Sequence, residues 1–175
     1  MSTPVSIGVS SCLLGERVRY DGGLKRNSYI CDELNRIFRL IPVCPEVGCG
    51  LPVPREAMRL EGDPADPRLM TINGRIDLTA RMQAFCEAKV EGLGPERLCG
   101  FIFKRNSPSC GMWLVGVYND DVPIGSGSGL FAAAVARRFP LLPVEEEGRL
   151  DDPLIREGFI ERVLGYSRRK DSQVG

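Results

Sequence analysis

Short apolar runs alternate with segments of helical periodicity along this chain, and this alternation constrains its fold more than any other feature. Segments near residues 27–39, 77–91 and 152–164 carry apolar side chains at helical spacing, and an Ala-rich helix ends near Arg138. Strands that alternate with helices favour a mostly parallel sheet with helices on both faces. We therefore expect a three-layer, Rossmann-like α/β fold. The predicted strands are residues 5–9, 40–43, 99–104, 113–118 and 141–144.

Two segments of the chain lack a regular pattern. Five prolines between residues 45 and 68 predict a long irregular segment there, and long loops of this kind often cover functional sites. The Gly-Ser-Gly-Ser-Gly run at residues 125–129 predicts a tight turn. We expect residues 1–165 to form a single domain and residues 166–175 to be a flexible tail.

Composition excludes several classes of function. The formal net charge of the 175 residues is zero, so a nucleic acid polymer is not an expected partner. No apolar run approaches the ~20 residues that a membrane-spanning helix needs, and no secretory signal is evident, so we expect a cytoplasmic protein. The seven cysteines would stay reduced there, which favours metal binding or catalysis over disulfides. The absence of histidine excludes a thiol–histidine hydrolase.

Three of the cysteines follow predicted strands and lie among small residues. Cys12 comes after residues 5–9, Cys44 after residues 40–43 and Cys110 after residues 99–104. Ligands collect where the strands of an α/β sheet end, so we expect the three thiols to converge. Cys31, Cys86 and Cys99 are instead placed as core residues are, and buried cysteine packs as a small hydrophobe.

Three converging thiolates predict a soft metal site with one open coordination position. Four thiolates would complete a cubane cluster or a structural zinc site, whereas three leave one metal free to act as a Lewis acid. The favoured ligand is then a sulfur-containing small molecule, and no redox step is required. Two alternatives stay open, namely a persulfide-based sulfur transferase without a cluster and a non-catalytic module that binds structural zinc.

The cysteine motifs resemble the small bacterial family that includes the thiouracil desulfidases. The matching motifs are Ser-Ser-Cys-Leu-Leu-Gly at residues 10–15, Pro-Val-Cys-Pro-Glu-Val at 42–47, Gly-Leu-Pro-Val-Pro-Arg at 50–55 and Lys-Arg-Asn-Ser-Pro-Ser-Cys-Gly at 104–111. The resemblance implies a [4Fe-4S] cluster held by Cys12, Cys44 and Cys110, with one iron free to take the sulfur of the substrate. It also implies a non-redox reaction in which a thiolated pyrimidine, or a related thioamide, yields the oxo-pyrimidine and sulfide.

The same resemblance assigns the catalytic side chains. The acid/base glutamate of the family corresponds to Glu46, and its serine corresponds to Ser107, with Ser109 as the second choice. Arg19 and Arg55 either recognise a carbonyl or carboxylate group of the substrate or pin the long loops by ion pairs. Cys49 departs from the family pattern, which has a small residue before Gly-Leu-Pro. If Cys49 bound the open iron as a fourth thiolate, it would abolish the substrate site.

Overall fold

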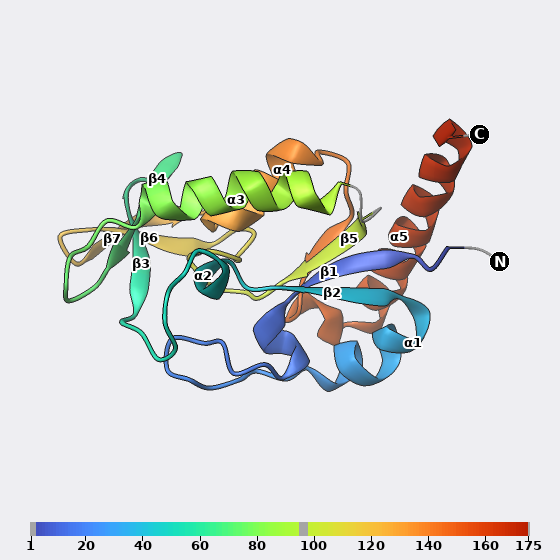
Figure 1. The fold of residues 1–175 in the computed structure, drawn as a ribbon, viewed down its shortest axis with the longest axis horizontal. Helices are drawn as coiled ribbons and strands as arrows, with labels where there is room; N and C mark the ends of the chain where they lie inside the picture. The colour runs from blue at the N-terminus through green and yellow to red at the C-terminus, as the bar shows by residue number, and fades with distance from the viewer. Residues whose placement is uncertain (1–2, 95–97, 175) are drawn as a thin grey trace.

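The parallel sheet predicted from the sequence is present and has four strands (Figure 1). The protein was analysed as a computed structural model that describes residues 3–94 and 98–174. Every strand pairing in this sheet is parallel, and Gly8 lies opposite both Ile41 and Phe101 on its two neighbours. The predicted α/β class is therefore confirmed. The strands, in spatial order, are β2 (Arg39–Val43), β1 (Ser6–Ser10), β5 (Leu98–Phe103) and β8 (Val144–Glu146).

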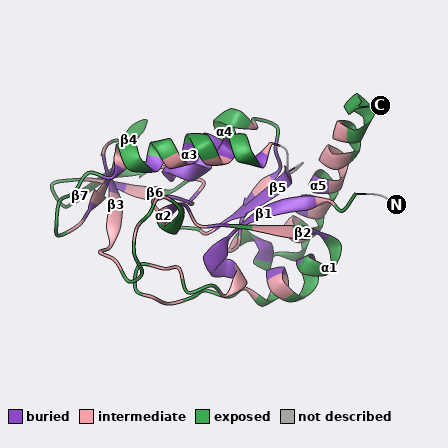
Figure 2. Cartoon of the chain, viewed as in Figure 1, coloured by how far each residue is buried: buried purple, intermediate pink, exposed green. Residues whose placement is uncertain are grey.

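Helices cover both faces of this sheet, because successive side chains of β5 enter two different cores. Phe101 and Phe103 pack with α3 and α4 on one face, whereas Ile102 packs with α5 on the other. Figure 2 shows β1 and β5 buried between these layers, while the outer turns of the helices are exposed. The helices are α1 (Asn35–Ile37), α2 (Pro45–Gly48), α3 (Thr79–Leu93), α4 (Leu130–Arg138) and α5 (Pro153–Val174).

A second, mixed sheet was not predicted. The expectation of an irregular segment at residues 45–68 is wrong, since this stretch contains α2, all of β3 and the start of β4. Pro67 is accommodated because β4 is an edge strand, where one side of the backbone needs no ladder hydrogen bond. The strands of this sheet, in spatial order, are β4 (Asp66–Thr71), β3 (Met58–Asp63), β6 (Val115–Asn119) and β7 (Val122–Gly127).

The hairpin of β6 and β7 differs from two further predictions. The strand expected from residue 113 begins at Val115, and the predicted turn at residues 125–129 is mostly strand, since β7 continues to Gly127. The reversal occurs at Asp120 and Asp121 instead, whose φ angles are 47° and 65°. Two consecutive positive φ angles match the right-handed twist of a two-residue hairpin turn. This turn carries β7 back toward the start of α4.

Several element ends differ from the predicted ones. Asn27 caps the first helical segment as expected, since its Oδ1 accepts the N–H of Ile30 at 3.1 Å, but the segment begins as a π-helix and ends at Ile37. The last strand begins at Val144 instead of Leu141. Helix α5 continues to Val174, so residues 166–174 of the predicted tail are helical, and residue 175 lies outside the described residues. None of the helices in the described part of the chain is long and apolar enough to cross a membrane.

Candidate active site

A cavity of about 220 Å³ lies where β1, β2 and β5 end, and all three predicted cysteines line it. Cys12 lies in a 3-10 turn directly after β1, Cys44 precedes the first residue of α2 directly after β2, and Cys110 lies in the loop after β5. The three strands are neighbours and run in the same direction, so their carboxyl ends meet at one edge of the sheet. The structure therefore brings together the three thiols that the sequence singles out.

Burial keeps the three thiols protonated in the absence of a ligand. Desolvation raises the pKa of Cys12 to about 11 and also raises the pKa of Cys44 and of Cys110. Among nearby charges, the Lys104 ammonium lowers the pKa of Cys12 most, and the Ser10 hydroxyl stabilises the ionised form of Cys110 by a hydrogen bond. A soft metal would replace these protons, because thiolate is the form that binds metal.

Three thiols that line one cavity are a soft donor set. Among residues 3–94 and 98–174, no three Cys, Asp, Glu or His side chains form a site for one metal ion. The cavity that the three thiols line is larger than several water molecules, which occupy about 30 Å³ each in the liquid. An iron–sulfur cluster binds each thiolate to a different iron, so its ligands stand apart around a bulky group. Cys12, Cys44 and Cys110 suit that arrangement.

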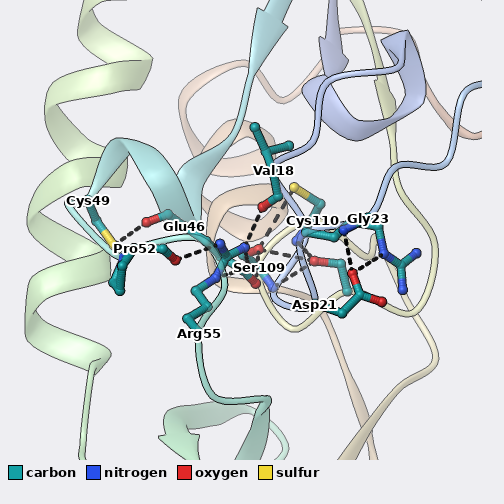
Figure 3. Close-up of polar contacts among 11 residues, drawn as sticks. Val18, Asp21, Gly23, Glu46, Cys49, Pro52, Arg55, Ser109 and Cys110 are labelled. Carbon is teal, nitrogen blue, oxygen red and sulfur yellow. Dashed lines mark hydrogen bonds and ion pairs between the residues drawn. The ribbon is translucent and has the colours of Figure 1, made fainter.

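Glu46 lies at the same cavity and is held by Arg55 (Figure 3). The Nε atom of Arg55 donates to Oε2 of Glu46 at 3.0 Å, and its Nη2 forms an ion pair with the same oxygen. The Arg55 side chain is 4% exposed, and it also donates to the carbonyls of Val18 at 2.7 Å and Pro52 at 3.1 Å. Arg55 therefore pins the loops around the cavity, as one of the two sequence interpretations expected, and fixes one oxygen of Glu46.

The two candidate serines have different surroundings. The hydroxyl of Ser109 is buried and donates to Oε1 of Glu46 at 3.2 Å. Ser107 Oγ accepts the backbone N–H groups of Cys110 at 3.1 Å and Ser109 at 3.3 Å, and it lies 3.1 Å from Ser109 Oγ. Ser107 therefore shapes the turn that carries Cys110, whereas Ser109 contacts the carboxylate. The resemblance favoured Ser107 and made Ser109 the second choice, although both lie in the same short motif and their contacts are not visible from the sequence.

Cys49 lies outside the residues that line the cavity. Its thiol donates to the carbonyl of Glu46 at 3.2 Å, and its side chain packs against the core that includes Cys86. Cys86 and Cys99 are buried core residues as expected, and the thiol of Cys31 donates to the carbonyl of Leu13 at 3.5 Å. The four remaining cysteines are thus placed apart from the three that meet.

Two charged residues at the site, Lys104 and Arg105, were not singled out from the sequence. Lys104 and Arg105 line the cavity directly after β5, and the Lys104 ammonium donates to Oε1 of Glu147 at 2.8 Å. Both residues lie at the start of the motif that ends in Cys110, so their position was a usable signal. Arg19 also lines the cavity, where its Nε lies 3.6 Å from Asp21.

The fold and the cavity define an α/β protein with a cysteine-lined site at the carboxyl edge of its parallel sheet. The sequence pattern of the 2-thiouracil desulfurase family matches residues 7–147, which include every site residue named above. A solved structure, the [4Fe-4S]-dependent thiouracil desulfidase TudS, shares 30% sequence identity and a TM-score of 0.69. That match covers 87% of this chain and 97% of TudS. Among curated proteins, none matches. The chain belongs to the 2-thiouracil desulfurase family.

Proposed function

We propose that this protein removes sulfur from a thiolated pyrimidine, with a [4Fe-4S] cluster held by Cys12, Cys44 and Cys110. The observation that carries the proposal is the meeting of these three thiols, from three separate parts of the chain, in one cavity. Family membership and the activity in the name of TudS support the same reaction. When bound, such a cluster supplies an iron without a protein thiolate, which is a Lewis acid for the sulfur of the substrate.

The protein contributes a carboxylate whose two oxygens have separate tasks. Oε2 of Glu46 is held by the Arg55 guanidinium, which fixes the orientation of the carboxylate. Oε1 faces Ser109 and can accept a proton through this hydroxyl or directly from water. Glu46 is therefore the general base that we propose, and it returns the proton as the reaction ends.

Ser109 is the group that we propose for orienting the attacking water. Its hydroxyl connects Oε1 of Glu46 with Oγ of Ser107, so a proton has a short path between water and carboxylate. Water adds its oxygen to the ring carbon, the carbon–sulfur bond breaks, and hydrogen sulfide leaves with both protons of that water. The oxidation state of the pyrimidine carbon is unchanged, so the reaction needs no electron donor.

Metal content is the test of this proposal. Protein purified or reconstituted without oxygen should contain about four iron and four sulfide per chain, and it should release sulfide from 2-thiouracil. Cys12→Ser, Cys44→Ser and Cys110→Ser should each lower the iron content, whereas Cys49→Ser is the matched control and should retain it. Zinc in place of iron, or no metal after reconstitution, would overturn the cluster. A persulfide enzyme would instead depend on a single cysteine and need no iron.

A further inference from the structure

Lys104 is a partly buried cation that the proposed reaction does not use. It directly follows β5 and lines the cavity that the three thiols line. Its Nζ donates to Oε1 of Glu147 at 2.8 Å and to the carbonyl of Arg105 at 3.0 Å, which fixes the ammonium in place. The side chains of Lys104 and Glu147 are 19% and 12% exposed. A surface lysine would sample many positions, whereas this one is held at the wall of the cavity.

The ammonium and the catalytic carboxylate come from different parts of the chain. Lys104 follows β5 directly, and its backbone N–H donates to Oγ of Ser10, two residues before Cys12, at 3.0 Å. Glu46 lies in α2, two residues after Cys44, and accepts from the hydroxyl of Ser109, the neighbour of Cys110. Lys104 thus approaches the site from the side of Cys12, away from the Glu46–Ser109 pair that we assign to proton transfer.

We propose that Lys104, positioned by Glu147, is the charge partner of the bound cluster and sets its reduction potential and its retention. This inference rests on the proposed function, since it requires the cluster. A cluster core held by three thiolates carries net negative charge, and burying unpaired charge in a protein is costly. A fixed ammonium offsets that cost, and it does so most for the reduced cluster, which carries one more electron. Lys104 is thus a positioning residue and not a catalytic one.

The pair of opposite charges provides an experiment in which the two substitutions have effects of opposite sign. Lys104→Met removes the cation and should shift the midpoint potential of the reconstituted cluster to more negative values. Glu147→Gln keeps an oxygen that can accept from Lys104 but removes the counter-charge, so it should shift the potential to more positive values. The potential is measured by reductive titration with dithionite, followed by electron paramagnetic resonance. A purely structural role would not produce shifts of opposite sign.

Retention of iron provides a second readout that does not depend on activity. In the presence of a ferrous chelator, Lys104→Met should lose iron several-fold faster than the wild type, and Lys104→Arg should restore the wild-type rate. Lys89→Met, on α3, makes the same change in net charge away from the cavity and should match the wild type.

The outcomes separate this inference from the proposed function. A wild-type protein that holds no cluster would overturn the proposed function. If the wild type holds a full cluster and the potentials of Lys104→Met and Glu147→Gln are unchanged, only the role of Lys104 is overturned. If Lys104→Met retains too little cluster to titrate, a positive shift of the potential in Glu147→Gln and a wild-type rate of iron loss in Lys104→Arg support the role of Lys104. The absence of both overturns it.

Discussion

The hydroxyl of Ser109 donates to Oε1 of Glu46 at 3.2 Å, although 63 positions separate the two residues in the chain. Glu46 is in α2, directly after β2, and Ser109 is in the loop after β5. Their contact therefore depends on the way the parallel sheet brings its strand ends together. It also gives the carboxylate one oxygen that accepts from a hydroxyl and one oxygen held by Arg55.

Replacing each of the two serines should give different results. Ser109→Ala removes the hydroxyl beside the proposed base, so we expect kcat to fall about 100-fold while the iron content stays at the wild-type value. Ser107→Ala removes the acceptor of two backbone N–H groups in the turn of Cys110, so we expect a loss of about 1 kcal/mol in stability and lower iron content. Iron analysis and sulfide release measure both effects. The reverse pattern would make Ser107 the catalytic serine.

Breaking the ion pair of Arg55 should destabilise the protein strongly. Arg55→Met leaves the carboxylate of Glu46 without its cation in a site where that carboxylate is 13% exposed, so we expect a loss of roughly 3 kcal/mol in the free energy of unfolding. Arg26→Met is the matched control, because Arg26 pairs with Asp32 at the surface and its loss should change the free energy of unfolding far less. Urea denaturation measures both. Equal losses in the two variants would contradict the structural role of Arg55.

Gly129, at the start of α4, should be as necessary for iron binding as Cys110, because it lies against the backbone of that cysteine. A Cβ at Gly129 would lie 2.5 Å from the backbone carbonyl carbon of Ser109 and 2.7 Å from the backbone nitrogen of Cys110. Gly129→Ala should therefore displace this turn and reduce both iron content and activity. Gly92→Ala, in α3, meets no atom within 4 Å and should leave iron content unchanged. A Gly129→Ala protein with full iron content would show that the turn can move without loss of the site.

The carboxyl group of Asp77 should make the stability of the protein fall as the pH is lowered through the acid range. Hydrogen bonds from Thr79, together with Arg68, lower the pKa of Asp77 from 3.8 to about 2. The unfolded chain therefore binds the proton first as the pH falls, so this stabilisation is present above about pH 4 and is lost toward pH 2. Asp77→Asn should flatten the pH dependence of stability in that interval, and Arg68→Met should flatten it partly. Denaturation at several pH values measures this, and an unchanged acid profile in Asp77→Asn would contradict it.

The sequence predicted the parallel sheet and its three cysteines because both depend on local patterns. The apolar runs that became β1, β2 and β5 are short and fully local, and Cys12, Cys44 and Cys110 follow them directly. The mixed sheet was missed because its hairpins depend on where the chain reverses. Asp120 and Asp121 adopt positive φ angles that their sequence does not require, and Pro67 in β4 is tolerated because that strand is at an edge.

The details of the site were beyond the sequence for a different reason. The choice between Ser107 and Ser109 depends on which hydroxyl faces Glu46, and the role of Lys104 depends on its contact with Glu147, 43 positions away. Contacts of this kind are set by packing between distant segments, and no motif spacing encodes them. The motifs identify the residue types at the site, whereas the geometry assigns their tasks.

The positions of the three thiols along the chain impose an order of assembly. Cys12 and Cys44 follow strands that are adjacent to each other, but Cys110 reaches the site only after β5 pairs with the other side of β1. During synthesis from the amino terminus, a chain that ends before β5 contains Cys12 and Cys44 but lacks Cys110, so the three-thiol site is incomplete. Insertion of the proposed cluster would therefore follow the pairing of β5, so that loading with iron and sulfide would be a late event that reports on a correctly folded sheet.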